Sequence, residues 1–404
     1  MALSSVRTAF ALAAALALHG CGGGGSTMDS PAVAPAPVAP PPAAPPTAVA
    51  VQVTERTSAL SNPWGIAFLP DGRAIVSERG GTLKLLSATG AVVGTVSGAP
   101  QVVTDGQGGL LDVVLDPAYA QNRRIYLSFS ERDPADPSRN GTAVARAELD
   151  TGAMALSQLS VIYRQLPKRA SSVHFGSRLV FDRSGHLFVT LGERFERDFA
   201  QDLATGHGKV ARITVDGAPA PGNPAWTQAG AQPHTWSYGH RNPQGAALHP
   251  VTGELWISEH GQQGGDEINR VLAGRNYGWP LASFSQEYET TTPIGMQTVP
   301  GTEPPLWVWD MIDGSAWTSG AKSSTAPAGI SFYTADAVPQ WRGSLFVGAL
   351  AGRALWRLTL DGNRVLAQER LLAERAQRIR DVEQGPDGAL YLLTDDGKLL
   401  RYGP

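Results

Sequence analysis

Residues 236–269 carry most of the side chains in this sequence that could do chemistry. They include the segments Trp236–Gly245, Ser258–Gly261 and Gly265–Asn269, which together hold an arginine, two asparagines, two histidines, three carboxylates and several glycines. Glycines allow the backbone to approach a ligand closely or to turn with a positive φ. This combination suits a polyanionic ligand that is held together with a hard cation.

A candidate general base lies earlier in the chain. His174 stands in the segment Val173–Phe181, immediately before a predicted strand. The pKa of a histidine lies near working pH, so its imidazole can accept a proton. A single histidine is more often a plain surface or core residue, and the chain has 8 of them. None stands in the closely spaced pattern that marks a zinc site.

Two arginines near the C-terminus form a candidate anion site. Arg378 and Arg380 are two residues apart in a predicted strand, so their side chains project from the same face. Paired guanidinium groups are suited to bidentate capture of carboxylates or phosphates. The alternative is a solvated strand face on which the arginines pair with Asp381 or Glu383.

Other motifs narrow the range of cofactors. Gly106–Asp112 is rich in glycine but lacks the lysine of a phosphate-binding loop, so it could equally be a tight turn between structural units. Gly265–Asn269 and Asn276–Pro280 offer carboxylate and carbonyl oxygens for calcium, without the spacing of an EF-hand. No Rossmann glycine pattern follows a strand, and no nucleophile-elbow serine motif is present, which argues against NAD and against serine hydrolysis.

A repeated pattern indicates the elements that must position these residues. A turn containing Asp, Asn or Gly leads into a strand of alternating, β-branched and aromatic residues. This pattern occurs in six units: Pro70–Glu78, Asn122–Glu131, Asp182–Glu193, Thr252–Glu259, Arg342–Gly348 and Pro386–Thr394. Repetition from end to end predicts an all-β protein, a six-bladed β-propeller with four-stranded antiparallel blades, rather than a β-sandwich or two unrelated β-domains. Ala48–Arg56 is expected to be the outer strand that closes the last blade.

The N-terminus has the features of an export signal. Arg7 precedes the apolar run Ala9–Leu18, which is too short to span a bilayer, and the run leads to Leu18-His19-Gly20-Cys21. Residues 1–20 are therefore predicted to be a signal peptide of the lipoprotein type. The expected product is a periplasmic, outer-membrane lipoprotein anchored at Cys21, with simple secretion as the alternative because His19 is unusual for that motif.

The amino-acid composition of the remaining residues indicates a tether followed by one folded domain. Residues 21–50 are rich in Gly, Pro and Ala, which predicts a disordered tether, and residues 51–404 form the propeller domain. The net charge is −3 and no basic tract occurs, so nucleic acid is not an expected partner. The single cysteine excludes internal disulfides. Contact with a membrane is expected only through the lipid anchor.

From about Asn62 to its end, the chain resembles the soluble aldose sugar dehydrogenases that depend on pyrroloquinoline quinone (PQQ), the glucose/sorbosone dehydrogenase family. The resemblance rests on seven motifs in the same order: Gly106–Asp112, His174–Leu179, Gly239–Gly245, Glu259–Gly261, Gly265–Asn269, Asn276–Pro280 and Arg378–Val382. It implies a six-bladed propeller, in agreement with the number of repeats.

The resemblance also implies an activity. His174 would take the proton from the anomeric hydroxyl of an aldose while hydride passes from sugar C1 to C5 of the quinone, which gives a lactone. Arg241 and Asn242 would bind PQQ, and Arg241 would stabilise charge at the quinone oxygen. The implied partners are aldose sugars and an unidentified electron acceptor, and the body would be a monomer or a homodimer.

Further roles follow from the same resemblance. The other implied PQQ contacts are Gln107, Tyr288, Ala349, Leu350, Ala351, Arg378 and Arg380. Relatives often have a lysine where this chain has Ala351, and only Arg353 stands close enough in sequence to compensate. One calcium ion would be held by carbonyls of Gly261 and Gln262 and would act as a Lewis acid on the quinone, and a second would use Glu267 and Tyr277.

Two other classes of protein remain as alternatives. The first is a propeller without a cofactor that binds carbohydrate or protein. The joint presence of His174, Arg241, Arg378 and Arg380 argues against it, because a binding module has no need of that combination. The second is a calcium-dependent propeller lactonase, which would place metal-binding carboxylates at the central channel.

Overall fold

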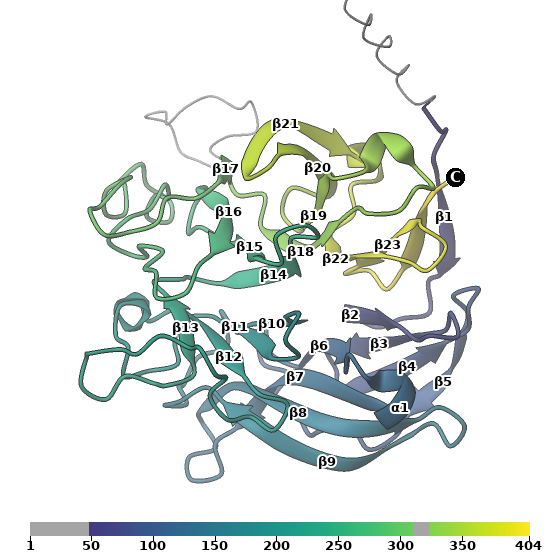
Figure 1. The fold of residues 1–404 in the computed structure, drawn as a ribbon, viewed down its shortest axis with the longest axis horizontal. Helices are drawn as coiled ribbons and strands as arrows, with labels where there is room; N and C mark the ends of the chain where they lie inside the picture. The colour runs from purple at the N-terminus through teal and green to yellow at the C-terminus, as the bar shows by residue number, and fades with distance from the viewer. Residues whose placement is uncertain (1–47, 310–322) are drawn as a thin grey trace, which may run out of the picture. The chain divides into compact units, whose positions relative to one another are not determined.

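The computed structural model describes residues 48–309 and 323–404, which form six four-stranded antiparallel sheets arranged around a central axis (Figure 1). The prediction of a six-bladed all-β propeller is confirmed. The predicted signal peptide, Cys21 and the tether up to residue 47 lie outside the described residues. Within the described part of the chain, no helix is long and apolar enough to cross a membrane.

Each blade consists of four strands, ordered from the channel outward. The first three blades are β2(Pro63–Phe68), β3(Ala74–Glu78), β4(Thr82–Leu86), β5(Val92–Val96); β6(Leu110–Leu115), β7(Arg124–Arg132), β8(Asn140–Asp150), β9(Ala155–Arg164); and β10(Gly176–Phe181), β11(Leu187–Leu191), β12(Lys209–Ile213), β13(Thr235–Tyr238). The others are β14(Pro243–Leu248), β15(Leu255–Glu259), β16(Asp266–Val271), β17(Trp307–Trp309); β18(Pro327–Phe332), β19(Leu345–Ala349), β20(Ala354–Asp361), β21(Arg364–Leu371); and β22(Ile379–Gln384), β23(Leu390–Thr394), β24(Leu399–Gly403), β1(Gln52–Thr57).

The last blade is closed by the first strand of the described chain. β1 pairs antiparallel with β24, with Gln52 opposite Gly403 and Val53 opposite Tyr402. The expected outer strand, Ala48–Arg56, is therefore confirmed as the closing strand, although it begins later, at Gln52, and ends at Thr57. Because one blade contains strands from both ends of the domain, the ring is held shut by backbone hydrogen bonds.

The six repeated units of the sequence all form the second strand of a blade: β3, β7, β11, β15, β19 and β23. Each second strand lies inside its own sheet, and the two neighbouring blades cover its faces. In β11, β15, β19 and β23 every residue is buried. Outer strands are much more exposed, as in β21. The repeat was visible in the sequence because burial on both faces demands β-branched, aromatic and small residues at nearly every position.

The innermost strands line the channel and share one irregularity. Each contacts the innermost strands of the two neighbouring blades. In each of them the pairing register breaks close to the first residues, and such a break changes the direction in which side chains point. At Gly329 in β18, a Cβ atom would lie 2.1 Å from Asp381 Oδ1 in β22, so glycine leaves the space for this carboxylate.

Candidate active site at one mouth of the channel

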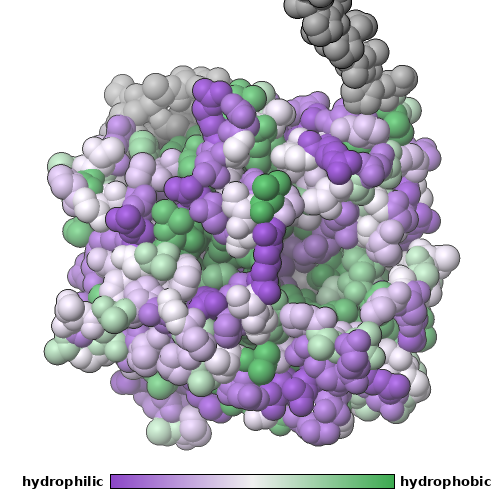
Figure 2. Space-filling view, viewed as in Figure 1, coloured by the Kyte–Doolittle hydropathy of each residue, from purple (hydrophilic) through white to green (hydrophobic). Residues whose placement is uncertain are grey.

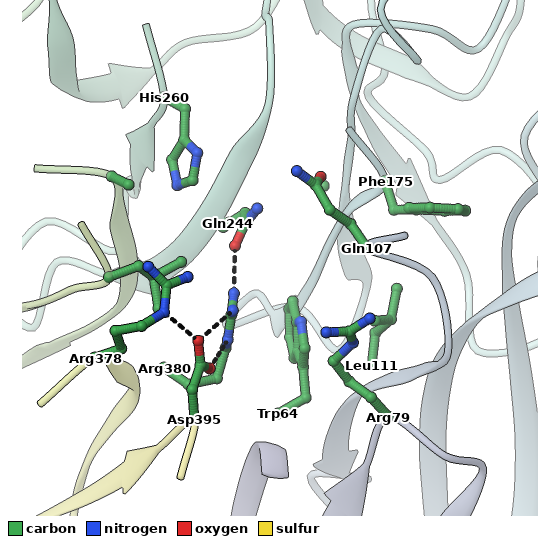
Figure 3. A pocket seen from close by; sticks show the side chains of 13 residues that line it. Trp64, Arg79, Gln107, Leu111, Phe175, Gln244, His260, Arg378, Arg380 and Asp395 are labelled. Carbon is green, nitrogen blue, oxygen red and sulfur yellow. Dashed lines mark hydrogen bonds and ion pairs between the residues drawn. The ribbon is translucent and has the colours of Figure 1, made fainter. Parts of the chain in front are cut away.

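The predicted site residues gather at one end of the ring. In an antiparallel blade, the start of the innermost strand and the end of the second strand lie at the same end. His174, Arg241 and Arg378 immediately precede or begin innermost strands, whereas Glu193 and Asp395 follow second strands. A cavity of about 280 Å³ opens here, and four of the predicted residues line it: Gln107, Leu350, Arg378 and Arg380 (Figure 3).

Positive charge dominates this cavity. Arg378 Nε and Arg380 Nε donate to the two oxygens of Asp395, at 2.7 and 3.0 Å. The sequence had offered Asp381 or Glu383 as their partners, and this alternative is wrong. Arg79, which belongs to none of the motifs in the sequence, lines the cavity on the side opposite Arg378 (Figure 3).

Arg79 adds a positive charge that no carboxylate balances. Its guanidinium donates to the carbonyl oxygens of Gly106 and Gly108. Among residues 48–309 and 323–404 it forms no ion pair. Burial lowers the pKa of Arg380, although the nearby charge of Asp395 opposes the effect. Three guanidinium groups therefore face one carboxylate, which favours an anionic ligand.

His174 lies next to this cavity in a constrained position. Its side chain is buried, its φ is 53°, and its backbone N–H donates to Gln107 Oε1 at 2.8 Å. His174 Nδ1 is 2.6 Å from Glu193 Oε2. Burial lowers the pKa of His174, the charge of Arg241 adds to this, and Glu193 opposes both. A neutral imidazole would carry its proton on Nδ1 and leave Nε2 able to accept one.

Glu193 was not among the predicted site residues. It is the last residue of the third repeated unit, and glutamate also ends the first, second and fourth units. That recurrence was the available signal, because the end of each second strand lies at the site. Glu193 orients the imidazole as the acidic member of a catalytic triad does.

We expect the exchange Glu193→Gln to change the pH dependence of the reaction proposed below. The rate should rise with pH as His174 loses its proton, with a pKa below its usual 6.5. Since the carboxylate of Glu193 raises this pKa, its loss should move the acidic limb to lower pH. The plateau kcat should also fall, by at most the ~10⁴-fold seen when the orienting carboxylate of a serine protease is replaced. A pH–rate profile measures both effects, and an acidic limb that stays in place would exclude this coupling.

Arg241 and Asn242 leave buried donors free. Arg241 Nη1 donates to the carbonyl of Gly261 at 2.7 Å and Nη2 to Tyr288 Oη at 3.0 Å. Asn242 Oδ1 accepts from the N–H of Gly176 at 3.1 Å. Arg241 Nε and Asn242 Nδ2 are buried and have no partner among the described residues. An unpaired buried donor costs about 1–3 kcal/mol, so these groups are suited to meet a ligand.

The segment Gly348–Arg353, in which Ala351 stands where relatives often have a lysine, contributes little to the cavity. Leu350 lines it, whereas Ala349 ends β19 within an apolar cluster and Ala351 is exposed. Arg353 is exposed and is not among the described residues that line the cavity. Arg79, and not Arg353, therefore supplies the third positive charge of the cavity.

The predicted calcium ligands lie in two places. The carbonyl of Gly261 accepts from Arg241 Nη1 at 2.7 Å, so a calcium ion would share this carbonyl with the guanidinium, and the N–H of Gln262 donates to Ser285 Oγ at 3.0 Å. Glu267 and Tyr277 line a separate cavity of about 250 Å³. Burial, and then the charge of Glu259, raise the pKa of Glu267 well above its usual value.

A cation at Glu267 would relieve this repulsion between carboxylates. Within the described ranges, no three His, Cys, Asp or Glu side chains gather as a metal-binding group. Calcium would therefore depend on backbone carbonyls at one place and on Glu267 at the other.

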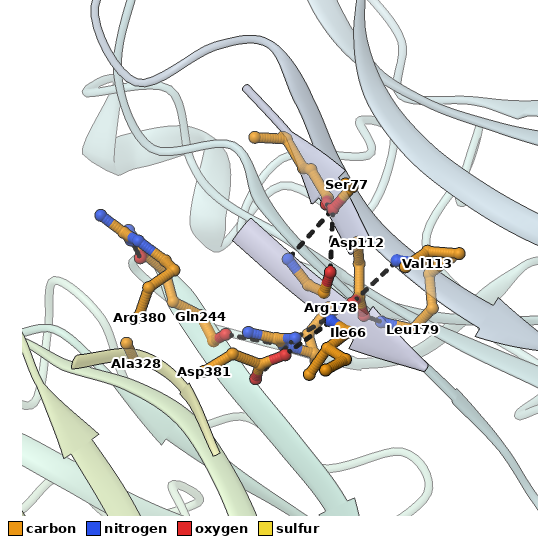
Figure 4. Close-up of polar contacts among 12 residues, drawn as sticks. Ile66, Ser77, Asp112, Val113, Arg178, Leu179, Gln244, Ala328, Arg380 and Asp381 are labelled. Carbon is orange, nitrogen blue, oxygen red and sulfur yellow. Dashed lines mark hydrogen bonds and ion pairs between the residues drawn. The ribbon is translucent and has the colours of Figure 1, made fainter. Parts of the chain in front are cut away.

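A charged cluster links the innermost strands β6, β10 and β22, and we call Asp112, Arg178 and Asp381 the channel cluster (Figure 4). Arg178 Nη1 donates to Asp112 Oδ1 and Asp381 Oδ1, both at 3.0 Å, and its Nε donates to the carbonyl of Gln244 at 3.1 Å. Gln244 Oε1 accepts from Arg380 Nη1 at 2.8 Å, so the cluster is joined to the anion-binding cavity. A second cavity of about 410 Å³ is lined by later residues of the innermost strands.

The fold and the site together define a class of protein: a six-bladed propeller with a buried histidine–glutamate pair beside an arginine-lined cavity at one channel mouth. The face of the ring in Figure 2 mixes polar and apolar residues and is hollowed near its centre. The chain belongs to the Glucose / Sorbosone dehydrogenase family, whose sequence profile matches residues 60–401.

Two of the similar proteins are named as dehydrogenases. The chain is 43% identical over 359 residues to aldose sugar dehydrogenase YliI of Escherichia coli, covering 88% of this chain and 93% of the relative. It is 27% identical over 407 residues to quinoprotein glucose dehydrogenase B of Acinetobacter calcoaceticus, covering 84% of each chain.

Solved structures share the fold. The soluble aldose sugar dehydrogenase of Escherichia coli in its apo form superposes with a TM-score of 0.81 and 42% identity, covering 88% of this chain and all of that chain (100%). The PQQ-bound aldose sugar dehydrogenase of Streptomyces coelicolor gives a TM-score of 0.71 and 30% identity, covering 88% of this chain and 98% of that chain.

Proposed function

We propose that the protein is a PQQ- and calcium-dependent aldose sugar dehydrogenase that oxidises C1 of an aldose to the lactone. The observation that carries the proposal is the pair His174–Glu193, 2.6 Å apart, beside a cavity with three arginines and one carboxylate. The name of the Escherichia coli relative supports the substrate class, and the PQQ-bound Streptomyces structure supports the cofactor.

The residues present fit a polycarboxylate quinone. Arg79, Arg378 and Arg380 would meet the carboxylates of PQQ, and the free Nδ2 of Asn242 would donate to its oxygens. When bound, PQQ would supply an ortho-quinone that accepts hydride, and calcium near Gly261 and Gln262 would polarise it.

The chain's own residues would then handle the proton and the charge. His174 Nε2 accepts the proton of the anomeric hydroxyl, and Glu193 stabilises the resulting imidazolium from the Nδ1 side. Arg241, fixed by Gly261 and Tyr288, holds a positive charge where negative charge develops. Because these groups are held in place before the sugar arrives, little reorganisation is needed during the reaction.

The test is reconstitution of metal-stripped protein with PQQ and calcium, followed by dye reduction with glucose and other aldoses. Activity that requires both additions supports the proposal. A folded protein that binds PQQ in neither the presence nor the absence of calcium would overturn it and favour the cofactor-free binding module. The electron acceptor would be sought afterwards among redox proteins of the same compartment.

We expect Arg79→Gln to weaken PQQ binding. A lost hydrogen bond to a charged group costs about 1.5–3 kcal/mol, which corresponds to a rise in Kd of roughly 10- to 100-fold. Quenching of tryptophan fluorescence by PQQ gives the Kd without turnover. Arg353→Gln is the matched control, since Arg353 is exposed and outside the cavity. Equal affinities of the two variants would show that Arg79 does not meet the cofactor.

We also propose that the protein is exported and anchored to the outer membrane, facing the periplasm. The support is the predicted signal peptide, residues 1–20, followed by Cys21. Metabolic labelling with palmitate tests the anchor. Label in the wild-type protein that is lost in Cys21→Ser supports it, whereas an unlabelled wild-type protein in the soluble periplasmic fraction would favour simple secretion.

A further inference from the structure

Phe195 is an exposed aromatic residue in a costly backbone conformation. Its side chain is 55% exposed, and both Arg194 and Phe195 have left-handed φ values, 64° and 65°. Such conformations in residues other than glycine cost about 1–3 kcal/mol each and persist where the surroundings enforce them. Exposure of a large apolar ring in such a segment suggests that the ring has a binding role.

The surroundings hold this segment firmly. The N–H of Phe195 donates to Glu193 Oε2 at 2.6 Å, the same oxygen that meets His174. The guanidinium of Arg194 is almost fully buried and lies 3.6 Å from the ring centroid of Phe175. The Phe195 ring is therefore presented to solvent by the structure that orients the base.

Two aromatic rings flank the reactive groups. The centroid of the Phe195 ring is 5.4 Å from that of His174, at an interplanar angle of 70°. On another side it is 6.4 Å from the ring of Tyr288, at 27°. Tyr288 is 47% exposed, and its hydroxyl accepts from Arg241. Neither ring is among the described residues that line the anion-binding cavity, whereas both lie next to the groups beside it, His174 and Arg241.

This arrangement matches the surface of a sugar ring. A pyranose presents C–H bonds on its faces and hydroxyls around its edge, whereas an aromatic face carries partial negative charge and is apolar. Polar groups stand close by for the hydroxyls: Arg197 pairs with Glu287 at 2.7 Å, and Gln262 bonds to both. The half-exposed ion pair can exchange its partners for a ligand at little cost.

We propose that Phe195, together with Tyr288, is the platform on which the aldopyranose stacks, so that its anomeric carbon lies beside His174. This inference rests on the proposed function and adds a positioning residue for the sugar. Since Phe195 is not among the described residues that line the anion-binding cavity, its loss should weaken binding of the sugar and leave PQQ binding unchanged.

The experiment compares Phe195→Ala, Phe195→Trp and Leu366→Ala in the protein loaded with PQQ and calcium. Leu366 is the control, because it is 54% exposed on the outer strand β21. Phe195→Ala should raise KM for glucose about 10-fold, the equivalent of one aromatic contact, with a smaller change in kcat. Phe195→Trp should restore KM, and the Kd for PQQ should stay within about twofold in all variants.

A KM that is unchanged in Phe195→Ala would overturn the platform. A parallel loss of PQQ affinity, without rescue by Phe195→Trp, would also overturn it and assign Phe195 a structural role. Saturation-transfer NMR with glucose provides a readout without turnover. Glucose binding that depends on Phe195 in an inactive protein would refute the proposed oxidation but support the platform, whereas no glucose binding would refute the platform itself.

Discussion

Replacing His174 with glutamine should lower kcat for aldose oxidation by about 10²- to 10⁴-fold, the usual contribution of a general base. Glutamine can still donate to Glu193, but its amide does not accept a proton near neutral pH. The Kd for PQQ should change little, because His174 is not among the described residues that line the anion-binding cavity. Steady-state kinetics with saturating PQQ and calcium, combined with fluorescence titration of PQQ, separate the two effects.

His249→Gln is the control for this experiment. His249 packs against Trp256 and Phe332, away from the site, and burial lowers its pKa as it does for His174. This variant should keep the wild-type kcat. If His174→Gln also kept it, proton transfer would have to be assigned to another group, and the mechanism proposed for the pair His174–Glu193 would fail.

Replacing Arg178 with leucine should destabilise the protein by about 3–5 kcal/mol, the cost of breaking a buried ion pair by removing one partner. Arg178 is 5% exposed and is the cation of the channel cluster. Burial raises the pKa of Asp112 to about 6, although Arg178 opposes this, and burial also raises the pKa of Asp381. Without Arg178 both carboxyls would stay buried with no positive charge beside them.

The loss of folding stability caused by Arg178→Leu should depend on pH. A carboxyl whose pKa is raised in the folded protein stabilises the fold at low pH, and this contribution disappears as pH rises through the folded pKa. Removal of Arg178 raises these values further, so the difference from wild type should be larger at pH 8 than at pH 5. Urea unfolding at the two pH values measures it.

Arg364→Leu is the matched control for Arg178→Leu, since it removes an exposed ion pair with Asp361. Its free energy of unfolding should stay within about 0.5 kcal/mol of wild type. A loss in Arg178→Leu no larger than in this control would mean that the channel cluster does not hold the innermost strands together.

The sequence by itself determined the architecture. The second strands of the blades are buried on both faces, so burial constrained almost every residue in them and made the six units visible. The closing strand was also predictable, because an unpaired strand at one end of such a repeat must complete the last blade. The types of residue in the site, a histidine and several arginines, indicated an anion-binding site with a base.

Only the tertiary structure decided which of these residues meet. Arg79 and Arg378 are far apart in the chain, and closure of the ring brings their blades together. Asp381 was an expected partner of Arg380, but β22 breaks its pairing register between Ile379 and Asp381. Asp381 therefore points into the channel toward Arg178, and Asp395 takes its place at the arginines. Strand periodicity alone cannot predict such a break, because the bulge depends on the neighbouring strands against which each innermost strand packs.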